Sequence, residues 1–332
     1  MFALFLLACG TDAAAPEVTD DAPATPSGPL VIYSGRSESL MGPLFEKLEQ
    51  QLEIELDVQY GDTAQMVTRL ATEGDESPAD LILAQEVGHL DVLAKQGRLA
   101  PLPAAVMAPV DRRFVDPEKH WVGTSGRLRV VVVDSQAVAE ADRPASLRDL
   151  ADPRWKGKLG WAPTNGSMQS HLGALCSLWG EDVTRTWLEG VMANEPRRYP
   201  KNSPQVEAAD KGEIAVGWVN HYYLHRKADR SRAINHSFPT EGDAGNILML
   251  SGGAIPESAA QPERAAEVLA ALVAEPAQNY FAQETFEYPV RPGVKTHDNV
   301  PALSTVQLAD VDPTALTDLR CARKLLDEAD LL

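Results

Sequence analysis

The chain has 332 residues, which is enough for two domains or one large α/β unit. Its hydrophobic fraction of 44% supports a folded core and excludes global disorder. The 48 acidic and 30 basic residues give a net charge of −18. Nucleic-acid-binding proteins carry a basic surface, so this balance argues against nucleic acid as a partner and is compatible with a cationic ligand.

The first 28 residues differ in composition from the rest of the chain. Met1 to Ala8 is almost wholly apolar, but it is too short to cross a bilayer as a helix. The string Leu6 to Cys9 resembles a bacterial lipobox, whose cysteine is lipidated and becomes the mature N-terminus. Residues 10–28 are rich in Ala, Pro, Thr and Asp, which predicts a flexible tether. We therefore expect residues 1–28 to be a signal remnant with a lipidation site at Cys9 and a tether. A buried apolar terminus is the alternative.

From Gly28 onward, strand and helix patterns alternate along the chain. Strands are predicted at 30–33, 54–60, 80–84, 127–134, 157–162, 213–220 and 246–255. Amphipathic helices are predicted at 38–51 and near 63–73, and the C-terminal third is otherwise expected to be helical. This alternation indicates a largely parallel sheet covered by helices. The long β segments near 127–134 and 246–254 are expected to cross between two lobes.

Ligands bind open α/β sheets beyond the carboxyl ends of the strands. Polar loops follow four predicted strands, at 33–38, 85–86, 163–170 and 221–225. In the third loop, Thr164, Asn165, Gly166 and Ser167 precede apolar residues at helical spacing, which is typical of a capped helix start. The free N–H groups of such a start bind anions, although most caps hold no ligand.

Two adjacent tyrosines, Tyr222 and Tyr223, lie in "VNHYYLH" (219–225), directly after a predicted buried strand. A phenol has a pKa near ~10 and ionises at neutral pH only beside a strong charge, which a bound cation supplies. Phenolate is a hard oxygen donor, so the pair favours a hard cation such as Fe(III). Packing of one ring in the core is the alternative. His221 and His225, spaced i and i+4, also allow a zinc site.

No nucleophile elbow, P-loop, HExxH or dinucleotide-binding motif occurs, so an enzyme is unsupported. Cys176 and Cys321 are 145 residues apart, and both a disulfide and two buried thiols are compatible with their apolar surroundings.

Together these segments resemble the periplasmic ferric-binding proteins, which are substrate-binding subunits of bacterial iron(III) ABC importers within the family 1 extracellular solute-binding proteins. The resemblance runs from about Leu30 to the C-terminus. It is carried by "VIYSGR" (31–36), "SPADLILAQE" (77–86), "PRWKGKLGWAPTNGS" (153–167) and "VNHYYLH" (219–225).

The resemblance implies an α/β, two-lobed periplasmic-binding-protein fold of type II. Each lobe would be a mixed, mostly parallel sheet flanked by helices, with a hinge of two crossing β segments. The lobes are expected to comprise residues 29–128 plus 253–303 and residues 129–252 plus 304–332.

The resemblance also implies a set of site residues. Tyr222 and Tyr223 match the iron-binding phenolates. Asn165, Gly166, Ser167, Asn202 and Asn220 match the site of a synergistic anion such as carbonate or phosphate. Arg36 and Arg127 are expected as charge partners near the metal or the anion.

This chain departs from some family members at two positions. Ser37 occupies the place of a histidine ligand, and Gln85 occupies the place of a glutamate ligand. Tyr33 or Glu86 is the alternative donor. A preformed ferric chelate, or an organic anion such as a phosphonate or carboxylate, is the alternative cargo.

The implied function is transport without catalysis. The protein is expected to be a monomeric lipoprotein of the periplasm, held at a membrane only by its lipid anchor. It would deliver ferric iron to an ABC permease and its ATPase subunits.

Overall fold

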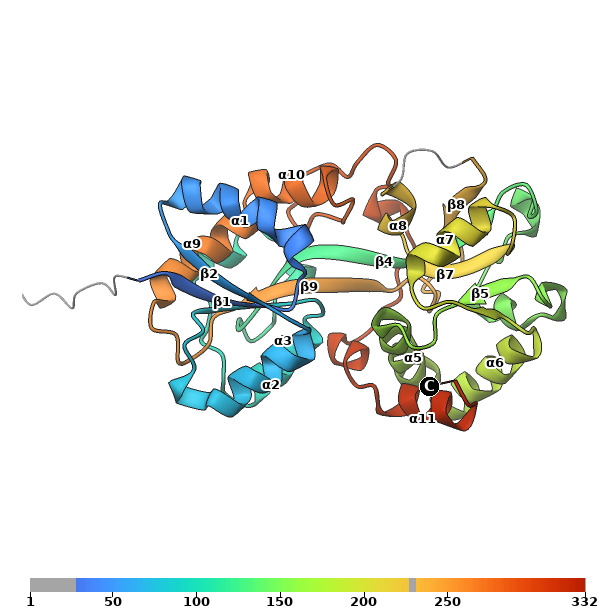
Figure 1. Ribbon diagram of the computed structural model, residues 1–332, viewed down its shortest axis with the longest axis horizontal. Coiled ribbons are helices and arrows are strands. Elements are labelled where there is room, and N and C mark those ends of the chain that lie inside the picture. The colour runs from blue at the N-terminus through green and yellow to red at the C-terminus, as the bar shows by residue number, and fades with distance from the viewer. Residues whose placement is uncertain (1–27, 227–230, 332) are drawn as a thin grey trace, which may run out of the picture.

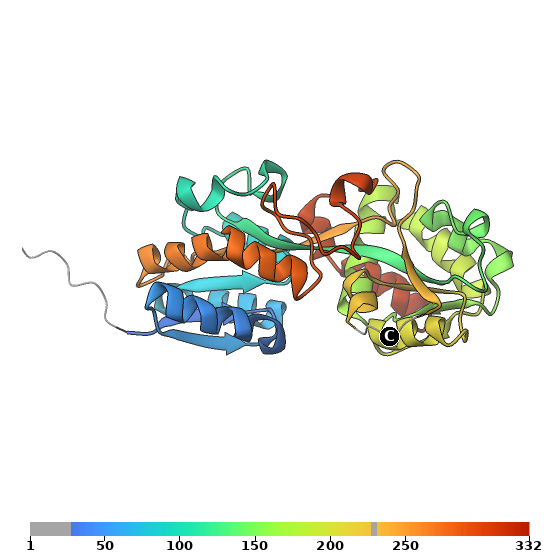
Figure 2. The same cartoon turned by 90° about the horizontal axis from the view of Figure 1, so that it is seen from above.

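The computed structural model describes residues 28–226 and 231–331. The predicted lipidation site Cys9 and nearly all of the tether lie outside these residues. Helices and strands form two lobes that are joined by two long strands, as Figures 1 and 2 show from two directions. Among the described residues, no helix is long and apolar enough to cross a membrane.

One continuous sheet runs through both lobes. Its strand order is β2 (Leu56–Tyr60), β1 (Leu30–Ser34), β3 (Leu81–Ala84), β9 (Leu248–Ala254), β4 (Val122–Asp134), β7 (Val216–Asn220), β5 (Leu159–Trp161) and β6 (Arg197–Arg198). A further strand, β8 (Ala233–His236), pairs with β4. The predicted mixed sheet is confirmed. Pairs within a lobe are parallel, and each antiparallel pair includes β4 or β9.

Helices cover the sheet separately in each lobe. The N-lobe, which contains β1 to β3, carries α1 (Glu38–Leu52), α2 (Thr63–Glu73), α3 (Gly88–Lys95), α4 (Ala104–Met107), α9 (Pro262–Leu272) and α10 (Glu275–Gln283). The C-lobe, which contains β5 to β8, carries α5 (Gly166–Trp179), α6 (Glu181–Ala193), α7 (Asn202–Asp210), α8 (Tyr222–His225) and α11 (Arg320–Glu328). Each lobe has its own large apolar core. In α1, for example, Met41, Leu44, Phe45 and Leu48 lie buried on one face.

Strands β4 and β9 form the connection between the lobes. They pair antiparallel from Val122 opposite Gly253 to Leu128 opposite Leu248, with an irregularity between Gly123 and Ser125. The crossing segments predicted from sequence are therefore present. The residue boundaries predicted for the lobes stay a prediction, because both strands contribute to each half of the sheet.

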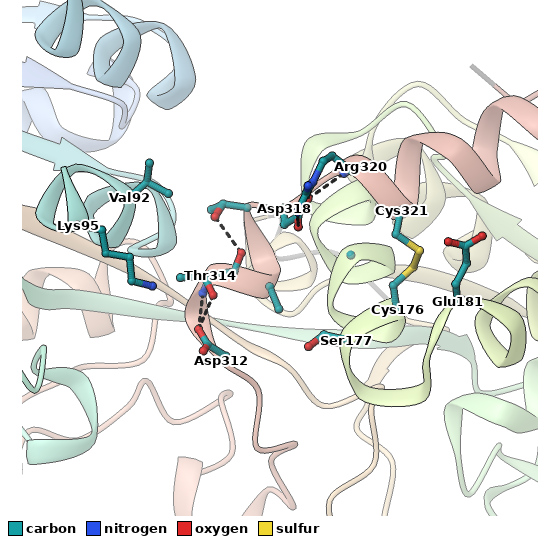
Figure 3. A pocket seen from close by; sticks show the side chains of 13 residues that line it. Val92, Lys95, Cys176, Ser177, Glu181, Asp312, Thr314, Asp318, Arg320 and Cys321 are labelled. Atoms are coloured by element: carbon teal, nitrogen blue, oxygen red, sulfur yellow. Dashed lines mark hydrogen bonds and ion pairs between the residues drawn. A yellow bond between two sulfur atoms is a disulfide. The ribbon is translucent and has the colours of Figure 1, made fainter.

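A disulfide joins Cys176 of α5 to Cys321 of α11 and fixes the C-terminal helix to the C-lobe, as Figure 3 shows. This resolves the alternative left open by the sequence. The turn at Pro313–Leu316, which precedes α11, contacts both α3 of the N-lobe and α5 of the C-lobe. A Cβ atom at Gly88 would lie 2.3 Å from the Pro313 carbonyl oxygen, so this contact requires glycine.

Candidate metal and anion site

A cleft of about 510 Å³ lies between the lobes. Its N-lobe wall consists of residues around the starts of α1, α2 and α3, and its C-lobe wall of residues around the start of α5, the end of β7 and α8. These loops follow the carboxyl ends of β1, β2, β3, β5 and β7, where ligands of α/β sheets bind. Of the predicted residues, the cleft brings together Ser37, Gln85, Glu86, Arg127, Asn165, Gly166, Ser167, Asn220, Tyr222 and Tyr223.

The tyrosine pair lies directly after β7, on the short helix α8. The two rings are 4.4 Å apart at their centroids, and Tyr222 is 5% exposed whereas Tyr223 is half-buried. Burial raises the pKa of the Tyr222 phenol, the neighbouring Tyr223 raises it further, and the positive charge of Arg127 opposes both. Tyr222 is therefore neutral at pH 7 without a ligand, and a cation in the cleft is needed to ionise it.

The predicted anion loop forms the N-terminus of α5. Asn165 is the N-cap, and its Oδ1 accepts hydrogen bonds from the Ser167 backbone N–H at 3.2 Å and the Ser167 hydroxyl at 2.6 Å. Asn202 lies behind the loop, where its Nδ2 is 3.4 Å from both Asn165 Oδ1 and Ser167 Oγ. The Oδ1 of Asn202 is buried and has no partner among the residues described. Because Asn165 already accepts from the Ser167, Met168 and Gln169 N–H groups, the loop offers an anion chiefly the Gly166 N–H and the helix dipole.

Arg129 of β4 lies behind the same loop and was not predicted. Its side chain is completely buried and donates to Asn220 Oδ1 at 2.8 Å and Ser167 Oγ at 3.3 Å. Its remaining partners, His171 and the Trp218 carbonyl, are also neutral, and within the described part of the chain no carboxylate pairs with it. Burial lowers the pKa of the guanidinium to about 9, so it stays charged at pH 7. A buried charge without a counterion is costly, which favours an anion nearby.

The two predicted arginines, by contrast, already have carboxylate partners. Arg36 donates to both Glu287 oxygens, at 3.0 and 2.9 Å, and to Ser125 of β4 at 3.0 Å. Arg127 donates to Glu86 Oε1 at 3.0 Å and to the Gln85 carbonyl oxygen. Arg36 is not among the residues that line the cleft, whereas Arg127 is. The Arg36–Glu287 pair is buried, and the Arg127–Glu86 pair, whose carboxylate is partly exposed, ties the loop after β3 to the crossing strand β4.

Tyr33 lies outside the cleft. Its hydroxyl donates to Glu73 Oε2 at 2.8 Å, and Arg69 stacks over its ring at 4.4 Å. The structure therefore does not place Tyr33 where it could replace a missing ligand. Asn202 also does not line the cleft, although it contacts the loop that does.

The zinc alternative does not fit the two histidines. His221 Nδ1 accepts from the Leu128 backbone N–H at 3.1 Å, so its Nε2 carries the proton and donates to the Phe286 carbonyl at 2.7 Å. Both nitrogens are therefore engaged in the core. Among the described residues, no group of three or more His, Cys, Asp and Glu side chains could hold a metal ion.

Five residues with titratable side chains in or beside the cleft were not predicted as site residues: Asp62, His89, Arg129, Arg226 and Glu287. Arg226 follows the tyrosines, and its guanidinium lies 4.6 and 5.2 Å from the centres of their rings. A signal existed for Arg129, since it is two residues from Arg127 on the same strand and so faces the same side. A signal also existed for Asp62, since it lies between the predicted strand 54–60 and the predicted helix near 63–73. No local pattern marks the other three.

A second, larger pocket of about 730 Å³ lies beside the disulfide, between α3, α5 and the start of α11 (Figure 3). Its charged groups are satisfied by one another or by neighbours: Asp318 pairs with Arg320, Lys95 with Asp91, and Glu181 with Lys324. It therefore lacks the unpaired charge that distinguishes the cleft.

The fold and the cleft together define a two-lobed solute-binding protein. The model of the bacterial extracellular solute-binding protein family matches residues 76–314, so the chain belongs to this family. The predicted class, a transport component rather than an enzyme, and the predicted fold are thereby confirmed.

Similar proteins have names that refer to ferric iron. The major ferric iron-binding protein of Neisseria meningitidis serogroup A is 28% identical over 98% of this chain and 97% of its own length. The Fe(3+)-binding periplasmic protein of Serratia marcescens is 27% identical over 91% of this chain and 90% of its own. Iron-bound HitA from Pseudomonas aeruginosa superposes with a TM-score of 0.81 at 27% identity, covering 91% of this chain and 98% of that one.

Proposed function

We propose that this protein binds Fe(III) together with a small anion between its two lobes and delivers it to an ABC permease. The observation that carries the proposal is the arrangement of the C-lobe wall. Tyr222 and Tyr223 at the end of β7 share the cleft with Ser167 of the α5 loop, and Arg129 lies behind that loop. The wall therefore offers two hard anionic donors beside an anion site.

Charge balance supports an anion such as carbonate or phosphate beside the tyrosines. Fe(III) and the Arg129 guanidinium exceed the two phenolates by two positive charges, so the site needs further negative charge. A buried site is most stable when its charges are balanced, because the low dielectric makes any net charge costly. The relatives named for ferric iron support the same cargo.

Delivery rests on closure of the lobes around β4 and β9. A ligand drives closure when it binds the closed form better than the open form, which requires contacts from both walls of the cleft. The closed form is then the one that the permease and its ATPase subunits accept. Cys9, as a lipidated residue, would hold the monomer at a membrane of the periplasm.

A visible absorption titration tests the cargo and its ligands together. Purified protein titrated with ferric citrate in bicarbonate buffer is expected to develop a broad phenolate-to-iron charge-transfer band. The double variant Tyr222→Phe/Tyr223→Phe is expected to lose the band and more than about 100-fold in iron affinity, because both phenolate ligands are gone.

Tyr199→Phe is the matched control, because this half-buried tyrosine of the C-lobe does not line the cleft. It should keep both the band and the affinity. If wild type shows no band while a phosphonate or carboxylate raises its melting temperature, the organic-anion alternative replaces iron. A band that forms with ferric citrate, but not with Fe(III) supplied without citrate, would identify a chelate as the cargo.

A further inference from the structure

The C-lobe wall alone does not complete an iron site. Two phenolates and a bidentate anion supply four donors, whereas Fe(III) takes about six. Closure brings the N-lobe wall toward these donors. The inference rests on the proposed function and identifies the side chain of the N-lobe wall that reaches the metal.

Most donors of the N-lobe wall are already engaged or chemically weak. Glu86 is held by Arg127 at 3.0 Å, and Tyr33 donates to Glu73 outside the cleft. Ser37 and Gln85 offer only neutral oxygens, which cannot offset the charge of Fe(III). His89 lines the cleft and has a buried Nδ1 without a partner among the described residues, but an imidazole bound to a metal is a neutral nitrogen donor and adds no negative charge.

Asp62 is different from all of these. It lines the cleft at the N-cap of α2, yet its carboxylate makes no capping hydrogen bond. Aspartate at this position normally accepts from the first helical N–H groups, as Asp111, Asp152 and Asp312 do in this chain. Asp62 is exposed, and within the described residues no hydrogen bond or ion pair engages its carboxylate.

The backbone of Asp62 is nevertheless held firmly in place. The neighbouring Thr63 hydroxyl accepts from the Gln85 N–H at 3.0 Å and lies 3.4 Å from the Gly35 carbonyl oxygen, to which it donates. A Cβ atom at Gly35 would lie only 2.1 Å from this hydroxyl oxygen. Thr63 therefore joins the loops after β1 and β3 to the start of α2. A donor on such a fixed base is suited to precise coordination.

We propose that Asp62 is the N-lobe ligand of the bound iron: its carboxylate, free in the cleft, coordinates the metal when the lobes close on Tyr222 and Tyr223. An ionised carboxylate is a hard oxygen donor of the kind that Fe(III) prefers. Because Asp62 and the tyrosines belong to opposite walls, this bond makes the closed form the better binder and so drives closure.

The test compares Asp62→Asn with Asp57→Asn, which removes the same charge from an exposed position on β2 of the same lobe, outside the cleft. Each is titrated with ferric citrate in bicarbonate buffer. Asp62→Asn is expected to keep a charge-transfer band, because both tyrosines remain. The band should move to longer wavelength, because the iron loses an anionic donor, and the affinity should fall more than about 100-fold. Asp57→Asn should match wild type.

The possible outcomes separate this inference from the proposed function. A wild type without any band overturns the proposed function and with it this ligand. A wild-type band with Asp62→Asn unchanged in position and affinity overturns Asp62 alone. Weaker binding with an unshifted band also overturns it, because it indicates that Asp62 pairs with a cation such as Arg226 in the closed form. A His89→Gln variant that shifts the band while Asp62→Asn does not would assign the donor to His89. Equal melting temperatures without iron would show that Asp62→Asn folds normally.

Discussion

Arg129 has unusual surroundings for an ionised side chain in a protein core. It is completely buried, and its partners are the neutral groups of Asn220, Ser167, His171 and Trp218. A buried ion is usually paired, because leaving it alone costs several kcal/mol. An anion bound at the α5 loop, as proposed, would offset this cost, and this arginine would then link anion binding to the stability of the C-lobe wall.

We therefore predict that Arg129→Gln weakens iron binding by about 10- to 100-fold, the equivalent of one lost charge-assisted hydrogen bond. The loss should come through the anion. Wild-type iron affinity is expected to rise with bicarbonate concentration, and the variant should show little such dependence. Titration of both proteins with iron at several bicarbonate concentrations measures the difference.

Arg129→Lys is the conservative companion, because it keeps the charge but loses the planar fork that reaches both Asn220 and Ser167. It should retain part of the bicarbonate dependence. A bicarbonate dependence in Arg129→Gln equal to that of wild type would show that the guanidinium does not serve the anion.

The site residues that could be predicted from the sequence are those that lie close together in the chain. The Tyr222–Tyr223 pair and the Asn165–Ser167 helix start lie within short segments, so their types and order suggested donors and an anion loop. The isolation of Arg129 depends on Asn220 and Trp218, which lie about 90 residues away in the chain. No local pattern reveals which buried arginine lacks a carboxylate.

At the scale of elements, the C-terminal helix α11 depends on a long-range covalent link. It packs against α5, and the Cys176–Cys321 disulfide closes a loop with a sequence separation of 145. A cross-link that closes so long a loop lowers the entropy of the unfolded chain considerably. The Pro313–Leu316 turn, which contacts both α3 and α5, lies just before α11. The disulfide therefore also fixes the C-terminal end of the segment that makes these contacts (Figure 3).

We expect the double variant Cys176→Ser/Cys321→Ser to lose up to about 5 kcal/mol in free energy of unfolding, the value that loop-closure entropy predicts for this separation. Urea denaturation monitored by tryptophan fluorescence measures the loss. Wild type and variant are compared at neutral pH and without iron, because ligand binding would itself stabilise the folded state.

Reductant provides the matched control for this pair. It should lower the stability of wild type toward that of the double variant and leave the variant unchanged. Wild type and variant with equal unfolding midpoints, in the absence of reductant, would contradict the expected role of the disulfide.

The elements themselves were predictable where hydrophobic patterns were continuous. The strands near 127–134 and 213–220 appear as β4 and β7 because their apolar runs are buried. β4 begins earlier than expected, at Val122, because Gly123, Ser125 and Gly126 pair with β9 despite having no apolar pattern. The short strands β6 and β8 were not predicted, since residues such as Arg197 and Asn235 carry no strand signal.

At the scale of the whole molecule, the relative position of the lobes is a tertiary property that the sequence did not provide. It follows from the antiparallel pairing of β4 with β9 and from the contact of the Pro313–Leu316 turn with both lobes. These contacts place the N-lobe wall, with Asp62, opposite the tyrosines. The pairing partners are more than 100 residues apart, so composition and periodicity cannot reveal them.

The stability of the whole molecule should depend on pH through buried histidines, and His171 of α5 is the clearest case. Its Nδ1 accepts from Arg129 Nε at 3.4 Å, so its Nε2 carries the proton and donates to the Ala244 carbonyl at 2.6 Å. Protonation would place a second cation beside Arg129 in the core. Burial, and then Arg129, accordingly lower the pKa of His171 from 6.5 to about 3.

Because the folded-state pKa of His171 lies below its unfolded value, its contribution to stability is fully present above about pH 6.5 and is lost as the pH falls toward 3. Within this window, the unfolded state binds a proton that the folded state excludes. His171 alone should therefore lower the free energy of unfolding by up to about 1.4 kcal/mol for each unit by which the pH falls.

Urea denaturation of iron-free protein at a series of pH values between about 6 and 4 measures this slope. His171→Gln should unfold with a slope smaller by this amount, although its stability at neutral pH is lower. An equal slope in both proteins would show that His171 does not exclude its proton in the folded state, and that the charge of Arg129 does not dominate this part of the core.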